Sequence, residues 1–470
     1  MELEGHTRAG SNRDGLWAGT VFVILFALFF AFRQESYWSD ARHLIRALHE
    51  GSLRRHHFAY PPIAFGFHEL SGLLGNDEPK LSLQLLSALS GALTGALLYL
   101  AGRRFGFAPL PSLFGVALVC ASPVVSFYAT CVEVHALQLA FAAGAVYWAA
   151  CTRDEPPRSA AVAALFLTGI FGAHMAGLLW APALLVFLYW KGSGTTRPRH
   201  FAAGLAIMIL AAVGWRLANP GSDNQGSLHI SRSLKELLMV FRPKVFYATL
   251  VQPLGVLGVV GILTLVSIRG SLRETLRKPH AAATLVLFSC MLPFAATLRI
   301  PERGAYYITL ALPLGLMAAH LVQNGPRVLR VAAPFALLLQ VYLAAKQYHD
   351  WEIDYPGAEW VPALREETGE KGVILAGERW EWTAIQFHSK LTCISPSMPQ
   401  RPESAMPERG REVTLRMMER GLGRGGVLGV TRNFWESEDP LLVPWRELLL
   451  ERYGEPIPGH RPEYLLFPRP

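Results

Sequence analysis

The sequence predicts a polytopic α-helical membrane protein of about eleven transmembrane helices, followed by a C-terminal extracytoplasmic α/β domain. Three observations support this fold class. Of the 470 residues, 51% are hydrophobic and only 17% are charged, whereas soluble proteins usually carry about 25% charged residues. Before residue 346, apolar runs of about 18 to 24 residues recur, each long enough to cross roughly 30 Å of hydrocarbon. Beyond it, short apolar strands alternate with helical patterns.

The apolar runs divide residues 1–345 into candidate spans. The stretch 159–190 is too long for one crossing, and Gly172, His174 and Gly177 near its middle predict a tight turn between two short helices. The eleven candidate spans are approximately 16–32, 82–102, 108–128, 132–151, 159–174, 177–190, 201–218, 245–268, 281–298, 305–323 and 328–346.

The distribution of Lys and Arg predicts the orientation. The predicted inside turns contain basic residues, from Arg8 and Arg13 to Arg327 and Arg330, and the short outside turns near 130 and 175 contain none. Only the turn 299–304 breaks this trend. Because basic residues favour the cytoplasmic side, the N-terminus is expected inside, and eleven crossings put the C-terminus outside. The net charge of +8 therefore reflects topology, and no nucleic-acid partner is expected, because the basic residues form no continuous face.

Residues 346–470 predict a small α/β domain with a largely parallel sheet. Its expected strands are GVILAG, KLTCIS, GVLGVT and EYLLFPR, with helical patterns between them. The segment GLGRGG at 421–426 is similar to a phosphate-binding glycine loop. It follows a helix and precedes a strand, which is the reverse of the dinucleotide-binding order, so we interpret it as a helix C-cap and turn.

Polar residues gather at the outer ends of the predicted spans. Charge in a membrane protein is costly unless it is used or paired, and in this topology the five polar places open on one face, which predicts a single outward cleft. They are the first outer loop, 33–81, with Glu35, Asp40, His57 and Tyr60; 131–144 with Glu133 and His135; 171–178 with His174; 219–232; and 298–314 with Arg299, Arg303 and Tyr306.

Structural roles are open for several of these residues. Glu133 favours a helix N-terminus through the helix dipole, and His174 fits a turn. Arg299, Arg303 and Tyr306 suit an interfacial belt.

The segment 40–50 also has two interpretations. Its apolar residues Ala41, Leu44, Ile45 and Leu48 recur at helical spacing. This pattern predicts an amphipathic helix, either in the membrane interface or packed on the protein surface.

Five motifs follow one another along the chain: SYWSDARHL, HHFAYPPIAFGF, CVEVHALQL, TGIFGAHMAGLLWAP and PERGAYYITLALP. In this order they resemble the GT-C class of membrane glycosyltransferases, which use polyprenyl-phosphate sugars, and within it the protein O-mannosyltransferase-like family. The sequence departs from that family in three ways. Asp40 is the single acidic residue where the family has a pair, the family's His-Pro is absent, and His135 replaces a Tyr.

The resemblance implies a GT-C-like transmembrane domain over residues 1–345, with the active site in the first outer loop. The expected reaction is inverting transfer of a sugar from a polyprenyl-phosphate donor to a hydroxyl or amine, with Asp40 as general base. Arg303, then Arg299, would hold the donor phosphate with Tyr306. The expected substrate contacts are His57, Tyr60, Glu133, His135, His174 and Glu35.

Two other functions stay open. A membrane transporter or lipid flippase for an envelope glycan precursor would place charges at the midplane and show internal repeats, and neither is evident. A non-catalytic scaffold would tolerate replacement of Asp40, Glu133 and Arg303. No DxD motif is present, so no obligatory metal is expected, with a divalent metal left open. The acceptor is a protein, a lipid or a glycan.

Overall fold

The computed structural model divides the chain into two compact units, with the boundary between Trp351 and Glu352. We describe each unit by itself. The structure describes isolated positions, mostly helical, at 41–48, 177, 202–213, 381–385 and 415–423, and the continuous ranges 9–34, 59–76, 78–151, 156–174, 179–191, 279–298, 305–325, 327–353, 360–377, 391–394, 425–438 and 442–468.

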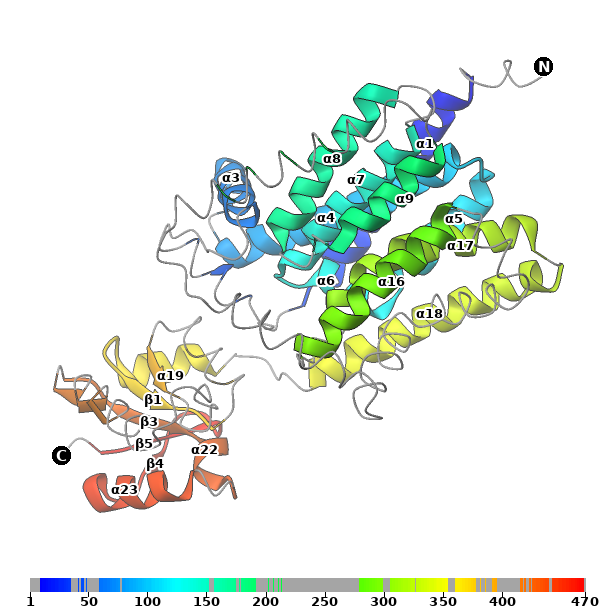
Figure 1. The fold of residues 1–470 in the computed structure, drawn as a ribbon. Helices are drawn as coiled ribbons and strands as arrows, with labels where there is room; N and C mark the ends of the chain where they lie inside the picture. Colours follow the sequence, from blue (N-terminus) through cyan, green and yellow to red (C-terminus); the bar gives the residue numbers. More distant parts are fainter. Residues whose placement is uncertain are drawn as a thin grey trace, which may run out of the picture. The chain divides into compact units, whose positions relative to one another are not determined.

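Helices of the first unit coincide with most of the predicted spans (Figure 1). The predicted hairpin within 159–190 is confirmed, because one helix ends at Ala173 and the next begins at Trp180. These helices are α1 (Ala9–Ala31), α4 (Pro79–Arg104), α7 (Val134–Cys151), α8 (Pro156–Ala173), α9 (Trp180–Lys191), α16 (Pro279–Leu298), α17 (Ala311–Asn324) and α18 (Arg327–Ile353), with a 3-10 helix, η4 (Ala305–Leu310), before α17.

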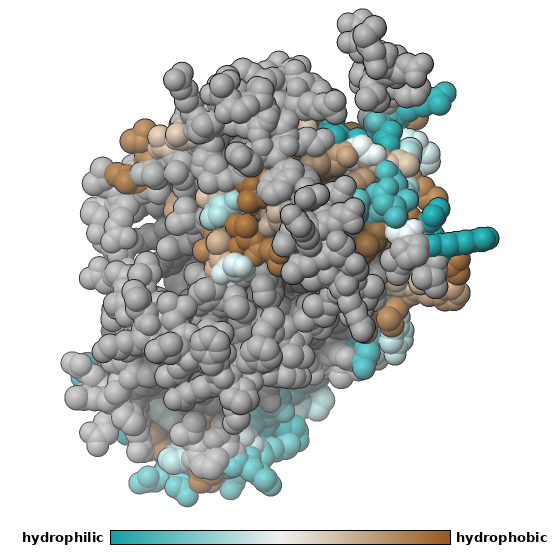
Figure 2. All heavy atoms as spheres, turned by 45° about the vertical axis from the view of Figure 1, so that its right-hand side comes forward, coloured by the Kyte–Doolittle hydropathy of each residue, from teal (hydrophilic) through white to brown (hydrophobic). Residues whose placement is uncertain are grey.

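Membrane-spanning character is clear for some of these helices. Within the described residues, three helices are long and apolar enough to cross a membrane, or up to four if a bent pair is one span. Eleven crossings therefore stay a prediction. Helices α1 and α18 expose apolar side chains, for example Val23 and Phe335, as expected for a surface facing lipid. Figure 2 shows such brown, apolar patches beside teal, hydrophilic ones on the visible face.

The predicted span 108–128 is not one straight helix. It consists of α5 (Pro109–Cys120) and α6 (Pro123–Thr130), which are bent by 68°. Pro123 has no N–H to donate to the preceding turn, and its ring would clash with that turn. Ser122 then caps the new helix, because its Oγ accepts a hydrogen bond from the Val125 N–H at 3.4 Å.

The core of the first unit is formed by α4, which packs against α1 and α7, and by α7 against α8. Glycine and phenylalanine interlock between α7 and α8. A Cβ on Gly144 would lie 2.2 Å from the Phe166 ring, and one on Gly169 would lie 2.6 Å from the Phe141 ring. Each ring therefore fills the space left by a glycine on the facing helix, which lets the two backbones approach closely.

The C-terminal unit contains a five-stranded sheet in the order β2-β1-β3-β5-β4. The pairs β2–β1 and β1–β3 are parallel, whereas the pairs β3–β5 and β5–β4 are antiparallel. The expectation of a largely parallel sheet is therefore wrong, because β5 runs against β3 and forms a hairpin with β4 across a short turn. The strands are β1 (Val373–Leu375), β2 (Thr392–Ile394), β3 (Leu428–Thr431), β4 (Ile457–Pro458) and β5 (Tyr464–Leu466); the helices are α19 (Val361–Thr368), α22 (Arg432–Glu436) and α23 (Val443–Tyr453).

Candidate functional site

A buried polar group lies at the beginning of α7. Glu133 and His135 are each 3% exposed. The Glu133 Oε2 accepts a hydrogen bond from the Val134 N–H at 3.1 Å. The His135 Nδ1 lies 3.2 Å from the Gln138 Oε1 on the next turn of the helix. Burial of a carboxylate and an imidazole side by side costs free energy, so this end of α7 is unusual for an apolar helix bundle.

Two other rings adjoin His135. Its ring centroid lies 4.9 Å from that of Tyr128 on α6 and 4.9 Å from that of His174, just after α8. The hairpin that holds His174 is tight, since the Gly177 N–H donates to the His174 carbonyl at 2.8 Å. A Cβ on Gly177 would lie 2.4 Å from the Ile170 carbonyl oxygen, so only glycine fits there.

Tyr60 lies beside the same group. It is the first residue of α3 (Tyr60–Leu73) and is 1% exposed, and its hydroxyl has no hydrogen-bond partner among the described residues. Burial raises the pKa of Tyr60, and the nearby Glu133 carboxylate raises it further. The hydroxyl therefore stays protonated and is a free hydrogen-bond donor next to a buried carboxylate.

The structure thus brings together four residues that the sequence singles out: Tyr60, Glu133, His135 and His174. They come from three separate parts of the chain: the start of α3, the start of α7 and the turn after α8. Tyr306 lies in η4, and its side chain is outside the described part of the structure. Outside the described residues altogether are Glu35, Asp40, His57, Arg299 and Arg303.

Four apolar positions of the segment 40–50 are described. Ala41, Leu44, Ile45 and Leu48 are helical and between 1% and 8% exposed. Their burial favours the packed alternative over one in which the apolar face enters lipid, and the polar face of the predicted amphipathic helix lies outside the described residues.

Three polar residues that sequence reasoning missed lie close by. They are Gln34, Gln84 and Thr130, which are joined by hydrogen bonds and are each at most 6% exposed. The available signal was a polar side chain near a span end, such as Gln84 in 82–102 or Gln34 just after 16–32. The sequence alone did not show that these side chains meet.

The opposite end of the bundle has a different character. Arg103 at the end of α4 pairs with Asp14 near the start of α1, with Nε 2.8 Å from Oδ1. The Ala108 N–H donates to Gln323 Oε1 at the end of α17 at 2.7 Å. Exposed arginines also lie at this end, among them Arg104. The polar group around Glu133 is therefore at the far end of α1 and α4 from this basic end.

Among the side chains that the structure describes, no group of three or more His, Cys, Asp or Glu residues is arranged to hold a metal ion. Glu35 and Asp40 are outside that set, so independence from metal stays a prediction.

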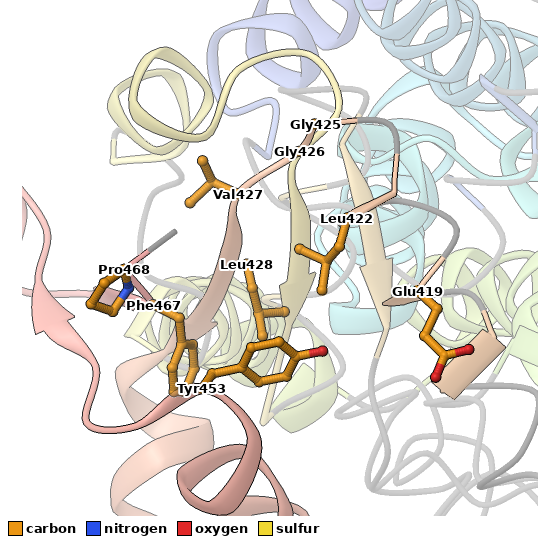
Figure 3. A pocket seen from close by; sticks show the side chains of 9 residues that line it. All are labelled: Glu419, Leu422, Gly425, Gly426, Val427, Leu428, Tyr453, Phe467 and Pro468. Atoms are coloured by element: carbon orange, nitrogen blue, oxygen red, sulfur yellow. The ribbon is translucent and has the colours of Figure 1, made fainter. Parts of the chain in front are cut away.

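The C-terminal unit contains a separate cavity of about 410 Å³. Figure 3 shows Leu422, Leu428, Tyr453 and Phe467 on its walls, with Glu419 at one side. None of the described residues that line it is Lys or Arg. The segment 421–426 adjoins this cavity. The Gly423 N–H donates to the Glu419 carbonyl at 2.8 Å and the Gly425 φ is +81°, as expected for the predicted C-cap and turn.

The fold of the chain is the GT-C fold of membrane glycosyltransferases. The crystal structures of ArnT from Cupriavidus metallidurans, in the apo state and bound to undecaprenyl phosphate, both match with a TM-score of 0.62 at 13% identity over 96% of this chain and 97% of theirs. The apo oligosaccharyltransferase of Archaeoglobus fulgidus matches with a TM-score of 0.55 at 13% identity, over 94% of this chain and 73% of that one.

Other comparisons add little. The protein O-mannosyltransferase complex Pmt1-Pmt2 of S. cerevisiae covers 44% of this chain with a TM-score of 0.35 and 17% identity, which is too low to assign the chain to that branch of the class. No protein-family model and no curated protein sequence matches the chain.

Proposed function

We propose that this protein transfers a sugar from a polyprenyl-phosphate donor to an acceptor hydroxyl or amine at the outer face of the membrane. The observation that carries the proposal is the buried Tyr60 hydroxyl, which has no hydrogen-bond partner among the described residues and lies within electrostatic range of Glu133. His135, two residues after Glu133, is in ring contact with His174. A buried donor without a partner costs free energy, so a substrate oxygen is its natural acceptor. The GT-C fold supports a lipid-linked substrate, and it does not favour a transporter or flippase.

Asp40 is the proposed general base. In the inverting reaction, the acceptor oxygen attacks the anomeric carbon from the face opposite the phosphate. The bond between this carbon and the phosphate oxygen breaks, Asp40 takes the acceptor proton, and polyprenyl phosphate leaves. Asp40 follows Gln34 by six residues, and a segment of that length reaches at most about 20 Å, which keeps it within range of the group around Glu133.

The other roles follow from charge. Arg303 and Arg299, with the Tyr306 hydroxyl, would bind the departing phosphate through charge-assisted hydrogen bonds. Tyr60, Glu133, His135 and His174 would contact sugar or acceptor, with His57 and Glu35 from the first loop. The basic end of the bundle favours the cytoplasmic side, so we propose that the group around Glu133 faces outside. The proposed eleven crossings would leave the C-terminal unit outside as well.

The test is Asp40→Asn in proteoliposomes supplied with a panel of undecaprenyl-phosphate sugars and acceptors. Loss of a general base lowers a rate by about 10² to 10⁴, so we expect at least a hundredfold fall in sugar transfer. Asp14→Asn is the matched control, since it removes a carboxylate at the other end of the bundle. Transfer by Asp40→Asn within a few-fold of wild type would remove Asp40 as the base.

A further inference from the structure

A buried chain of hydrogen bonds joins three elements where the first outer loop begins. The Gln34 backbone N–H donates to the Thr130 carbonyl at 2.9 Å, and its Nε2 donates to Thr130 Oγ1 at 2.8 Å. The Gln84 Nε2 on α4 donates to the Gln34 backbone carbonyl at 2.6 Å. We call Gln34, Gln84 and Thr130 the glutamine latch.

The glutamine latch is not needed to pack the helices. Gln34 is 6% exposed, and Gln84 and Thr130 are 4% exposed. Helices α1 and α4 already contact each other along an apolar surface, so a leucine at position 84 would keep apolar packing but would remove the donor to the Gln34 carbonyl. A buried side-chain amide is costly unless it is hydrogen-bonded. The presence of the latch therefore indicates that the Gln34 backbone has to be held in one position.

The latch holds the segment that carries Asp40. Thr130 is the last residue of α6 and precedes Glu133 by three residues, so Gln34 is fixed next to the polar group. The loop is also fixed where it ends, because the Ala59 N–H donates to the Gly172 carbonyl at 2.9 Å, two residues before His174. Both ends of residues 35–58 are thus attached to the elements that carry Glu133 and His174.

We infer that Gln84 is a positioning residue for sugar transfer. Its amide donates to the carbonyl of Gln34, the last described residue before Asp40, and Gln34 is in turn bonded to Thr130, three residues before Glu133. This inference rests on the proposed function, because it assigns Asp40 to the reaction. The described contact of Gln84 is with the Gln34 backbone, so we expect its loss to lower kcat and to leave the donor KM unchanged.

The test compares Gln84→Leu with Ser90→Ala on the same helix. Ser90 is equally buried, at 3% exposure, but its Oγ donates only within α4, to the Leu86 carbonyl at 2.7 Å. Both variants are reconstituted as full chains. The measurements are kcat and donor KM with undecaprenyl-phosphate sugars, the thermal midpoint, and amide hydrogen exchange over residues 35–58.

For Gln84→Leu we expect kcat to fall roughly tenfold, the effect of one lost hydrogen bond on a charge-bearing segment. Donor KM should stay within twofold and exchange over 35–58 should speed up, and Ser90→Ala should resemble wild type in every measurement. Gln84→Glu adds a pH readout, because a protonated carboxyl donates to the Gln34 carbonyl and an ionised one repels it. Its kcat, relative to wild type at the same pH, should therefore recover as the pH falls.

Equal kcat in Gln84→Leu and Ser90→Ala would overturn the inference, as would a lower kcat without faster exchange over 35–58. A fall in the kcat of Gln84→Leu that a lower thermal midpoint explains entirely would also overturn the inference. The exchange measurement needs no substrate. If the wild-type protein transfers no sugar, the proposed function fails, whereas the attachment of the loop through Gln84 is still decided by exchange.

Discussion

A carboxylate lies at each end of the helix pair α1 and α4, and the two carboxylates differ in their exposure to solvent and in their partners. At one end, Asp14 pairs with the Arg103 guanidinium at 2.8 Å, and both side chains stay about a quarter exposed. At the other end, Glu133 is almost fully buried and lies beside Tyr60, His135 and the glutamine latch. Charge at the first end is solvated and paired, whereas polarity at the second is removed from solvent.

This difference separates stability from function. An ion pair whose side chains are about a quarter exposed joins two helix ends at little cost in free energy. A buried set of polar side chains in a membrane bundle is expensive, and such sets mark functional sites. Replacements at the two ends should therefore have opposite consequences, with activity lost at the Glu133 end and only stability affected at the Asp14 end.

The largest effect is expected for Glu133→Gln. Glutamine keeps an oxygen that can accept from the Val134 N–H, so the helix start is preserved while the charge is lost. We expect kcat/KM for sugar transfer to fall by about 10², the usual cost of removing one electrostatic group from a site. Glu69→Gln on the exposed face of α3 is the control. Equal kcat/KM values for the two variants would show that Glu133 is only a helix-start residue.

A smaller effect is expected for Tyr60→Phe. The lost hydroxyl has no partner among the described residues, so its removal should leave the thermal midpoint unchanged or raise it. Sugar transfer should nevertheless fall roughly tenfold, because one hydrogen bond to substrate is lost.

The pH dependence sharpens this prediction. Burial raises the pKa of Tyr60 above its ordinary value near 10, so the hydroxyl stays a donor below that pH, and the ratio of wild-type to variant rate should be constant between about pH 6 and 9. Tyr342→Phe, on an exposed tyrosine of α18, should change neither rate nor stability. Slower transfer accompanied by a lower thermal midpoint would argue for packing instead.

The smallest effect is expected for Asp14→Asn. This variant breaks a partly exposed ion pair, which is worth about 0.2 to 1 kcal/mol, and it leaves the residues around Glu133 in place. Thermal unfolding in detergent should shift slightly downward, and more so at low salt, because screening already weakens the pair at high salt. The rate of sugar transfer should stay within twofold of wild type. A tenfold loss of rate would mean that the two ends are coupled.

Part of the site could be predicted from single residues. Tyr60, Glu133, His135 and His174 stand out because polar side chains at the ends of apolar runs need a reason, and the structure places them together. The glutamine latch did not stand out, because a lone Gln at the end of a run looks like an ordinary interfacial residue. The latch forms only when α1, α4 and α6 pack, because this packing brings Thr130 next to Gln34 although the two are distant in the sequence.

The sequence by itself determined where most helices lie, because the length of an apolar run is set by the thickness of the membrane and by a rise of about 1.5 Å per residue. It also determined the α8–α9 hairpin and the buried face of 40–50, since glycine placement and helical periodicity are local. The bend at Pro123 also has a local cause, because proline interrupts the helix and Ser122 caps the next one. Only the tertiary structure decided the antiparallel half of the C-terminal sheet and the approach of Tyr60 to Glu133. Both depend on how segments that are distant in the sequence pack together, and no local sequence pattern shows this packing.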